Sequence, residues 1–231
     1  MTRSAILPVS GLSGEKKEPR HDDLVIRPAE PGDAPLAAEL ILSTLNAFGD
    51  RLFGFGDHAR AVEVLAQFFR LPGNRFSYQY AAAAAIHGNL AGIMLAFTAG
   101  QMRRSMAVTA LQMARAFRWS EIPAFLANVI PYRSEEKIDS DELYIAHLAV
   151  ADTHRRKGVG QALLEHARQI APGLGKRQLS LITEVENAPA RALYEKFGFR
   201  LTETILPPPA MRSPDSKGDV RMVMPLNERS E

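Results

Sequence analysis

Apolar residues in the first part of the chain recur at extended and then at helical intervals. A short β-branched run begins near Leu24 and precedes a Pro-Gly-Asp sequence, after which apolar side chains follow with helical spacing up to Leu45. A second helical pattern covers about Asp57 to Phe69 and ends at the sequence LPGN. This part of the chain therefore predicts one strand and two helices.

The next two apolar runs are joined by a turn sequence. Residues 76–86 and residues 90–100 each read as a strand, and His87-Gly88-Asn89 between them is typical of a hairpin turn. The alanine run at residues 81–85 favours helix by intrinsic propensity, whereas the turn and the aromatic start favour a strand. We predict two strands.

Residues 101–140 differ in composition from the segments that flank them, and their apolar spacing is helical. Methionines and a phenylalanine gather on one side: Met102, Met106, Met113 and Phe117. Arginines lie elsewhere: Arg103, Arg104, Arg115 and Arg118. A connection of this length is uncommon without structure or function of its own. Because methionine adapts to irregular apolar partners, the segment either lines a binding pocket or packs as an extra helix or dimer surface.

Strand and helix patterns alternate through the rest of the chain, and no internal repeat is found. The predicted strands are DELYIAHLAV (141–150), RQLSLITEV (177–185), FRLTETIL (199–206) and DVRMVMPL (219–226). The predicted helices are KGVGQALLEHARQIA (157–171) and NAPARALYEKFG (187–198). Strands mixed with helices in this way indicate an α/β (α+β) fold class.

Composition narrows the class of protein. The chain has 231 residues, 46% hydrophobic and 23% charged, which is ordinary for a soluble globular protein. It contains no cysteine, so disulfides, thiolate metal sites and a cysteine nucleophile are excluded. The formal net charge of +2 is too small to indicate nucleic-acid binding. The apolar stretch near residues 80–97 is interrupted by His87-Gly88-Asn89 and falls short of the roughly 18 apolar residues of a membrane span.

The sequence RRKGVG lies between a predicted strand and a predicted helix. The helix has a buried stripe that starts at Val159, so its first turn lies at Lys157 to Gly160, where backbone amides lack intrahelical partners. Such donors and the helix dipole attract anions, and glycine lets an anion approach the backbone. The stretch is either a phosphate-binding helix start or a turn with solvated charges. Neither the Walker pattern nor the dinucleotide pattern of glycines fits it.

Two segments resemble the GCN5-related N-acetyltransferase (GNAT) superfamily. HLAVADTHRRKGVGQALLEHA closely resembles its acetyl-CoA-binding segment, whose signature Arg/Gln-x-x-Gly-x-Gly/Ala is matched by Arg155, Gly158 and Gly160. NAPARALYEKFGFR resembles its second segment and follows at about the right distance. The motif-level resemblance covers about Leu143 to Arg200, and the flanks match the family in their order of elements.

The resemblance implies a fold. We expect a mixed, largely antiparallel central sheet of about seven strands, flanked by helices and splayed between strands 4 and 5. The helical insertion 101–140 lies between strands 3 and 4, where we predict a lid over the acceptor. The mix of Ser, Gly, Pro and charged residues at residues 1–22 predicts a flexible N-terminal extension, and we expect residues 23–231 to form a single acetyltransferase domain.

The resemblance also implies how acetyl-CoA binds. Backbone amides of the loop hold the pyrophosphate, in the segment Arg155, Arg156, Lys157, Gly158, Val159 and Gly160. Backbone groups of Leu148, Ala149 and Val150 pair with the pantetheine amides, as an added strand pairs with a sheet edge. Asn187 either contacts the cofactor near its pantetheine arm or caps the following helix.

Acyl transfer to an amine needs a group that takes the amine's proton and an acid that protonates the departing thiolate. The resemblance implies that Tyr194 is the acid, and the alternative is that Tyr194 packs in the apolar face of its helix. For the base, the position that holds a glutamate or histidine in several relatives is Tyr144 here. Glu142 shares its strand face under strict alternation and could act through water, whereas His147 joins that face only if the strand has a bulge. We rank Glu142 before His147, and some members need no dedicated base.

These features predict an acetyl-CoA-dependent N-acetyltransferase that acts on a primary amine of a small molecule or peptide by direct transfer, releases coenzyme A and uses no metal. The alternative is a non-catalytic acyl-CoA sensor or interaction module of the same fold, because a conventional base is missing. We expect a cytoplasmic protein that binds neither nucleic acid nor membrane, and homodimer formation stays open.

Overall fold

A seven-stranded mixed sheet organises the computed structural model, which describes residues 24–116, 138–206 and 217–226. The strands lie in the order β1-β2-β3-β4-β5-β7-β6, and β4 and β5 form the parallel pair among otherwise antiparallel neighbours. The strands are β1 (Leu24–Pro28), β2 (Ala81–Ile86), β3 (Asn89–Phe97), β4 (Glu142–Val150), β5 (Gln178–Glu184), β6 (Arg200–Ile205) and β7 (Asp219–Pro225). The predicted sheet is confirmed.

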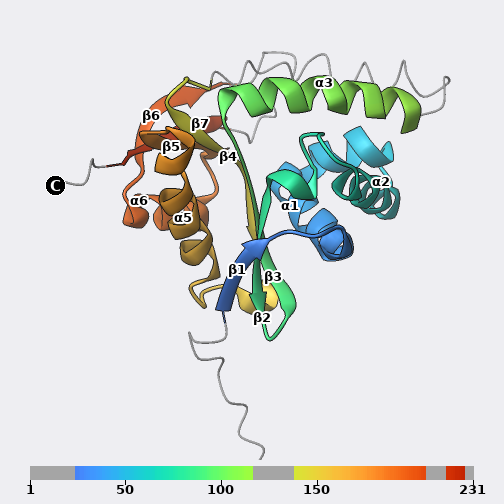
Figure 1. Cartoon of the computed structure of the whole chain (residues 1–231), viewed down its shortest axis with the longest axis horizontal. Coiled ribbons are helices and arrows are strands. Elements are labelled where there is room, and N and C mark those ends of the chain that lie inside the picture. Colours follow the sequence, from blue (N-terminus) through green and yellow to red (C-terminus); the bar gives the residue numbers. More distant parts are fainter. Residues whose placement is uncertain (1–23, 117–137, 207–216, 227–231) are drawn as a thin grey trace, which may run out of the picture.

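Helices cover both faces of this sheet (Figure 1). One face carries α1 (Ala34–Gly54) and α2 (His58–Arg70), and the other carries α5 (Val159–Ile170) and α6 (Ala188–Phe197). The remaining helix, α3 (Ala99–Ala116), follows β3, starts at the end of the sheet at which β4 begins and runs over α1 and α2. Short 3₁₀ turns are η2 (Pro31–Asp33), η3 (Tyr78–Tyr80), η5 (Asp152–His154) and η6 (Pro172–Leu174). We call the two sides of the sheet the α1–α2 face and the α5–α6 face.

Each face has its own apolar core. On the α1–α2 face, aromatic residues of the helices pack on inward-facing strand residues, with Phe53, Phe68, Phe69, Ile93 and Tyr144 among the cluster members. On the α5–α6 face the cluster includes Val159, Leu163, Leu143, Leu181 and Met222. Within the described ranges, no helix is both long and apolar enough to cross a bilayer.

The alanine run forms a strand, as predicted, although the strand is shorter than expected. All of β2 is buried, with Ala83 in the core of the α1–α2 face and Ala84 in the core of the α5–α6 face. Burial from both sides overrides the helix propensity of alanine. The aromatic residues before it form η3 instead of extending the strand, so the predicted start at residue 76 was wrong.

The predicted hairpin turn between β2 and β3 is confirmed. His87 and Gly88 both have positive φ, of 51° and 79°, which is the geometry of a type I′ turn. At the other end of β3, the strand stops at Phe97, and Ala99 and Gly100 already belong to α3. The predicted strand 90–100 therefore ended too late.

The predicted methionine face of the insertion is only partly right. Met102 and Met113 are buried in the core of the α1–α2 face, but Met106 is 47% exposed. Ser105 and Thr109 are buried on α3 instead, and the Thr109 hydroxyl accepts a hydrogen bond from the backbone N–H of Arg75. Part of the buried side of α3 is therefore polar, and Thr109 holds the loop before η3 by this hydrogen bond. Phe117 and most of the predicted lid lie outside the described residues.

The first helix extends beyond the predicted apolar pattern through a kink. Asn46 interrupts α1 with φ 48° and ψ −147°, a backbone conformation that residues other than glycine rarely adopt. Its side-chain amide donates to Glu184 Oε1 at 2.7 Å, near the end of β5. The Asn46 side chain at the kink thus links α1 to the part of β5 that lies beyond its pairing with β4.

Candidate active site

The parallel strands β4 and β5 separate part-way along their length. They pair from Glu142 with Gln178 to Ile145 with Leu181, and beyond this β5 continues against β7 only. The last residues of β4 remain paired with β3 on their other side, with Met94 opposite Leu148. Among the described residues, the β4 edge that faces the splay is thus unpaired from Ala146 to Val150. An extended ligand with amide groups could pair with this edge.

A β-bulge lies where the splay begins. Leu95 of β3 pairs with His147 and Ala96 pairs with Ile145, so Ala146 is an extra residue in β4. The bulge brings His147 onto the same face as Tyr144, which is the α1–α2 face. The bulge on which the candidacy of His147 depended is therefore present.

The loop after β4 has the geometry of an anion-binding helix start. Arg156 and Gly158 both adopt positive φ, of 61° and 81°, and Gly158 is the N-cap of α5. The N-cap has no side-chain hydrogen bond, so the first-turn amides of α5 are not capped from the Gly158 position. Arg155, Arg156 and Lys157 are exposed around it, and Arg155 also pairs with Asp152 at 2.7 Å. Uncapped amides and surrounding cations suit a phosphate group.

The two glycines of this loop have different roles. The backbone at residue 158 is left-handed, a conformation that favours glycine. That Gly158 also lets a phosphate approach the backbone stays a prediction. A Cβ atom on Gly160 would lie 3.1 Å from Leu193 Cδ2 of α6 and 3.7 Å from Val150 Cγ2. Gly160 therefore allows α5 to pack closely on α6 and β4, a packing role that the sequence analysis did not assign to it.

Asn187 caps α6, which was one of its two predicted roles. Its side-chain oxygen accepts a hydrogen bond from the backbone N–H of Ala190 at 3.3 Å, and Pro189 occupies the first turn. The residue is exposed, so its side-chain NH₂ group is accessible to a ligand. Contact with a cofactor stays a prediction.

Tyr194 lies on the buried side of α6. It is 7% exposed and packs against Phe199, with ring centroids 5.8 Å apart. Burial raises the pKa of Tyr194 to about 12. The hydroxyl therefore stays protonated at neutral pH, as a proton donor requires, while the ring also packs in the core of the α5–α6 face.

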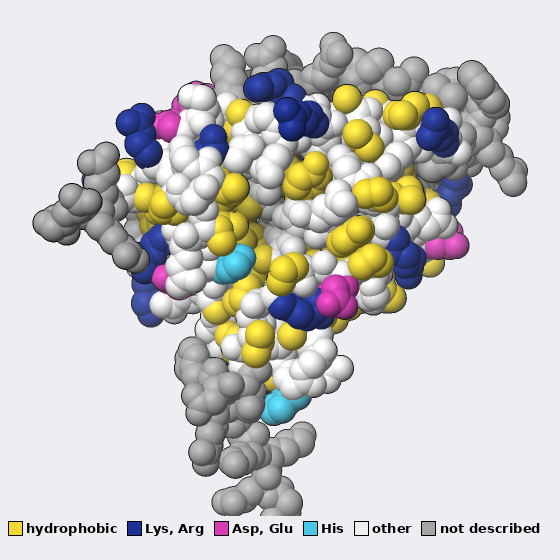
Figure 2. All heavy atoms as spheres, viewed as in Figure 1, with side chains coloured by type: hydrophobic (Ala, Val, Ile, Leu, Met, Phe, Trp, Pro, Cys, Tyr) yellow, Lys and Arg dark blue, Asp and Glu magenta, His cyan; other side chains and the backbone are white. Residues whose placement is uncertain are grey.

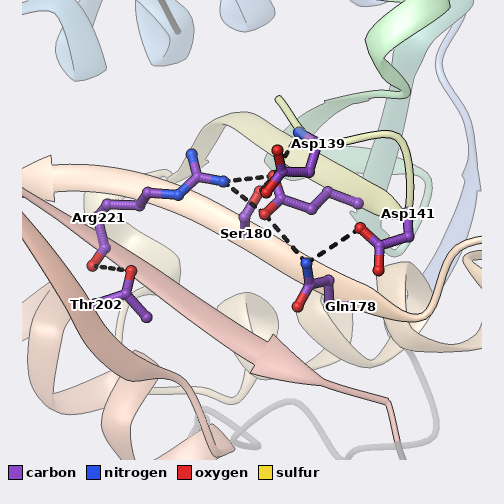
Figure 3. A network of polar contacts seen from close by, with 7 residues as sticks. Asp139, Asp141, Gln178, Ser180, Thr202 and Arg221 are labelled. Atoms are coloured by element: carbon purple, nitrogen blue, oxygen red, sulfur yellow. Dashed lines mark hydrogen bonds and ion pairs between the residues drawn. The ribbon is translucent and has the colours of Figure 1, made fainter. Parts of the chain in front are cut away.

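Glu142, ranked first as a base, is engaged in a buried network (Figure 3). Its side chain is 1% exposed, and Oε1 accepts a hydrogen bond from Arg221 Nη2 at 2.6 Å. Further hydrogen bonds come from Ser180 Oγ at 2.9 Å, Gln178 Nε2 at 3.3 Å and the backbone N–H of Asp139 at 3.3 Å. A carboxylate with these partners is not available to a water or an amine, and we no longer propose Glu142 as the base.

His147 is buried, at 4% exposure, between α1 and the segment before η3. Its Nδ1 lies 2.7 Å from Thr44 Oγ1, whose hydroxyl hydrogen is directed to the carbonyl of Ile41 at 2.7 Å. Nδ1–H is therefore the donor to Thr44, and Nε2 carries a lone pair that meets no partner among the described residues. Burial, with a smaller contribution from the nearby Arg75 cation, lowers the pKa of His147 to about 3. His147 is a neutral acceptor and a weak base.

Sequence reasoning missed the residues that hold these candidates. Thr44 is 103 residues from His147, and Arg221 is 79 residues from Glu142, so no local pattern connects them. One signal was available for Arg221, because it stands between Val220 and Met222 in a strand that is otherwise mostly apolar. Tyr144 is 3% exposed on the same face of β4 as His147.

Comparison with known proteins gives the family. The model of the Acetyltransferase (GNAT) family matches residues 59–199. The chain belongs to the GNAT acetyltransferase family. It is 34% identical over 74 residues to rat N-acetyltransferase family 8 member 3, a match that covers 32% of each protein. It is 40% identical over 62 residues to the streptothricin acetyltransferase of Escherichia coli, covering 27% of this chain and 36% of that protein.

Solved structures show the same GNAT fold. An N-acetyltransferase from Staphylococcus aureus Mu50 superposes with a TM-score of 0.67 at 18% identity, covering 87% of this chain and all of that one. The matches to the two curated relatives span only about a third of their length. In this chain, α3 lies between β3 and β4, and the splay lies between β4 and β5.

Proposed function

We propose that this GNAT protein is an acetyl-CoA-dependent N-acetyltransferase that transfers an acetyl group directly to a primary amine. The observation that carries the proposal is the splay between β4 and β5, which opens toward an uncapped, glycine-containing helix start. An unpaired strand edge and an anion site at its end match a ligand with amide groups and a pyrophosphate. Family membership supports the same ligand.

The chain's own groups suit the two parts of this ligand. First-turn amides at Val159 and Gly160 would hold the pyrophosphate, and the side chains of Arg155, Arg156 and Lys157 would add positive charge around it. The free backbone edge at Leu148, Ala149 and Val150 would pair with the pantetheine amides. Asn187, at the start of α6, would donate to the same arm. When bound, acetyl-CoA supplies an acetyl group as a thioester.

Tyr194 is the proposed proton donor. When the C–N bond to the amine forms and the C–S bond breaks, the departing thiolate would take a proton from the Tyr194 hydroxyl, and Tyr194 would regain a proton from water. With a pKa of about 12 the hydroxyl is protonated over the physiological range, although it is a weaker acid than an ordinary tyrosine. No metal takes part in this proposal.

We infer that the proton lost by the amine as the C–N bond forms would pass to solvent water on the α1–α2 face. Glu142 is occupied by Arg221, so the groups next to the bulge are Tyr144 and His147. The neutral His147 can accept a hydrogen bond at Nε2, but its low pKa makes it a poor proton store. We propose that the amine reacts in its neutral form without a dedicated carboxylate base, which some GNAT members do not need.

The acceptor is proposed to be a small molecule or a peptide amine. The name of the streptothricin acetyltransferase supports a small molecule. Lys and Arg side chains are spread over several elements on the face seen in Figure 2, including α3, and do not gather in one patch. This distribution favours neither nucleic acid nor a membrane as partner, and we propose a cytoplasmic enzyme.

Free thiol release tests the proposal against the acyl-CoA sensor. The purified chain is mixed with acetyl-CoA and a panel that includes an aminoglycoside-like amine, a polyamine, an amino acid and a short peptide. We expect thiol release that depends on both the chain and one class of amine. Tight binding of acetyl-CoA without release over the whole panel would favour the sensor.

A further inference from the structure

A buried ion pair crosses the sheet at the closed end of the splay. Glu142 lies on β4 and Arg221 on β7, so the arginine side chain passes over β5 to reach its partner (Figure 3). The Arg221 side chain is 11% exposed and the Glu142 side chain 1%. Ser180 and Gln178 of β5, underneath, also donate to Glu142. The Glu142 carboxylate on β4 thus accepts hydrogen bonds from both β5 and β7.

Stability alone does not explain these charges. Removing two charges from water costs free energy that their attraction only partly returns, and well-packed apolar residues often stabilise such a position equally well. What an ion pair with several hydrogen bonds adds is a defined geometry, because each donor must meet its acceptor at a fixed distance and direction.

The position of the pair coincides with the β4–β5 junction. Glu142 and Gln178 form the first rung of this junction, and Ile145 and Leu181 form the last. Arg221 pairs with Ile182, the first β5 residue beyond the last rung. The arginine side chain therefore runs from just inside the splay back to the first rung, and spans the whole paired segment.

The pair also lies on the side where the acceptor is proposed to bind. Along β7, Val220 and Met222 belong to the core of the α5–α6 face, so Arg221 between them points to the α1–α2 face, as Tyr144 does. The Arg221 backbone is held from the other side by β6, where a register shift exposes Thr202 and its hydroxyl donates to the Arg221 carbonyl at 3.3 Å.

A ligand that enters from the loop at residues 155–160 and pairs with Val150 and then Leu148 runs toward the bulge at Ala146. Its reacting end therefore arrives at the closed end of the splay. We propose that Glu142 and Arg221 are positioning residues that fix this closed end and so align the acyl group with the amine. The inference rests on the proposed function and adds residues that carry no role in it.

The test removes both charges while it preserves volume, in the double variant Glu142→Gln/Arg221→Met. We expect kcat to fall about 10-fold to 10²-fold, because small misplacements of reacting groups have effects of this size. The dissociation constant of acetyl-CoA should change little, since the anion site lies at the other end of the splay. Arg221→Lys, which keeps the charge, should retain most of the wild-type kcat.

Hydrogen exchange measured by mass spectrometry supplies a readout that does not need turnover. Peptides that contain residues 142–146 and 178–182 should exchange faster in the double variant, while peptides of α1 and α5 should not. The control is Arg177→Gln, which removes the neighbouring exposed pair with Asp141 at 3.2 Å while Asp141 still accepts from Gln178 Nε2, and it should alter neither kcat nor exchange.

Unchanged kcat in the folded double variant would overturn the inference, and so would a parallel loss of kcat and acetyl-CoA affinity, which would mean general loosening. If the double variant does not fold, Glu142→Gln replaces it: a lower kcat at unchanged acetyl-CoA affinity supports the inference, and a wild-type kcat overturns it. If the wild-type chain turns over no amine, the proposed function fails. Unchanged exchange at the two junction peptides would then overturn the positioning role of Glu142 and Arg221 as well.

Discussion

On the α5–α6 side of the splay, the proposed donor site is formed by neighbours in the chain, whereas on the α1–α2 side the candidate groups come from distant segments. Residues 155–160 make a loop whose backbone leads into the start of α5, and this loop is the proposed anion site. His147 and Glu142 depend instead on Thr44 and Arg221, from α1 and β7. We therefore expect acetyl-CoA affinity to depend on the backbone of residues 155–160. The reaction of the amine should depend instead on side-chain contacts between distant segments.

The largest effect should come from the backbone of the donor site. Gly158→Asp places a negative charge against the proposed phosphate and forces a side chain into a backbone with φ of 81°. We expect acetyl-CoA affinity to fall by about 10²-fold or more in calorimetry. Lys157→Ala, which leaves the backbone intact, should weaken binding only about threefold. Equal acetyl-CoA affinities of the aspartate variant and the wild type would show that this loop does not bind the phosphate.

Tyr194→Phe should separate chemistry from binding on the same side. The ring and its contact with Phe199 are preserved, and only the hydroxyl is lost. If the hydroxyl protonates the departing thiolate, kcat should fall about 10²-fold while acetyl-CoA affinity stays the same. Steady-state kinetics and calorimetry on one preparation measure both. A wild-type kcat would assign Tyr194 to packing alone.

Gly92→Ala tests whether the close packing of β3 against β4 and the start of α5 supports acetyl-CoA binding. A Cβ atom there would lie 2.9 Å from Val159 Cγ1, at the first residue of α5, and 3.0 Å from the Ala149 carbonyl. We expect a loss of about 1–3 kcal/mol in the free energy of unfolding, from overpacking, together with weaker acetyl-CoA binding.

The matched control for Gly92 is Gly100→Ala. A Cβ atom on Gly100 would meet nothing within 4 Å, and Gly100 lies in the first turn of α3, so alanine should cost no stability there. Urea titration of both variants makes the comparison. Equal free energies of unfolding for the Gly92 variant and the wild type would show that α5 can move away from β3 without loss of stability.

The smallest expected effect is a pH dependence on the α1–α2 side. The pKa of His147 is lowered by burial from 6.5 to about 3, so the unfolded chain binds a proton more readily between these values. The stabilisation is therefore complete above pH 6.5 and is lost as the pH falls. Between pH 7.5 and 5.5, the free energy of unfolding should decrease by about 1.4 kcal/mol through this residue.

His147→Asn serves as the comparison for that measurement, because its amide can still donate to Thr44. The variant should lose less stability over the same pH interval than the wild type does, by about 1.4 kcal/mol. Denaturant titrations at the two pH values measure it. Parallel pH profiles of the two proteins would show that His147 is not held neutral.

The sequence by itself determined the order of the strands and helices along the chain, the hairpin at His87-Gly88 and the glycine-containing loop at residues 155–160, which we propose as the anion site. Each of these depends on spacing within a few residues: apolar periodicity, a turn that needs positive φ, or amides at a helix start. The aromatic residues of η3 and the exposed Met106 were misassigned because tertiary contacts outweigh local pattern there.

Only the tertiary structure decided which acidic and basic side chains are available. Glu142 has a carboxylate and shares the strand face of Tyr144, but Arg221 reaches that carboxylate across β5 and occupies it. The bulge at Ala146 turns His147 to the α1–α2 face, where burial and Thr44 keep it neutral. Protonation and access depend on what surrounds a group in space, and those surroundings come from residues that lie far apart in the chain.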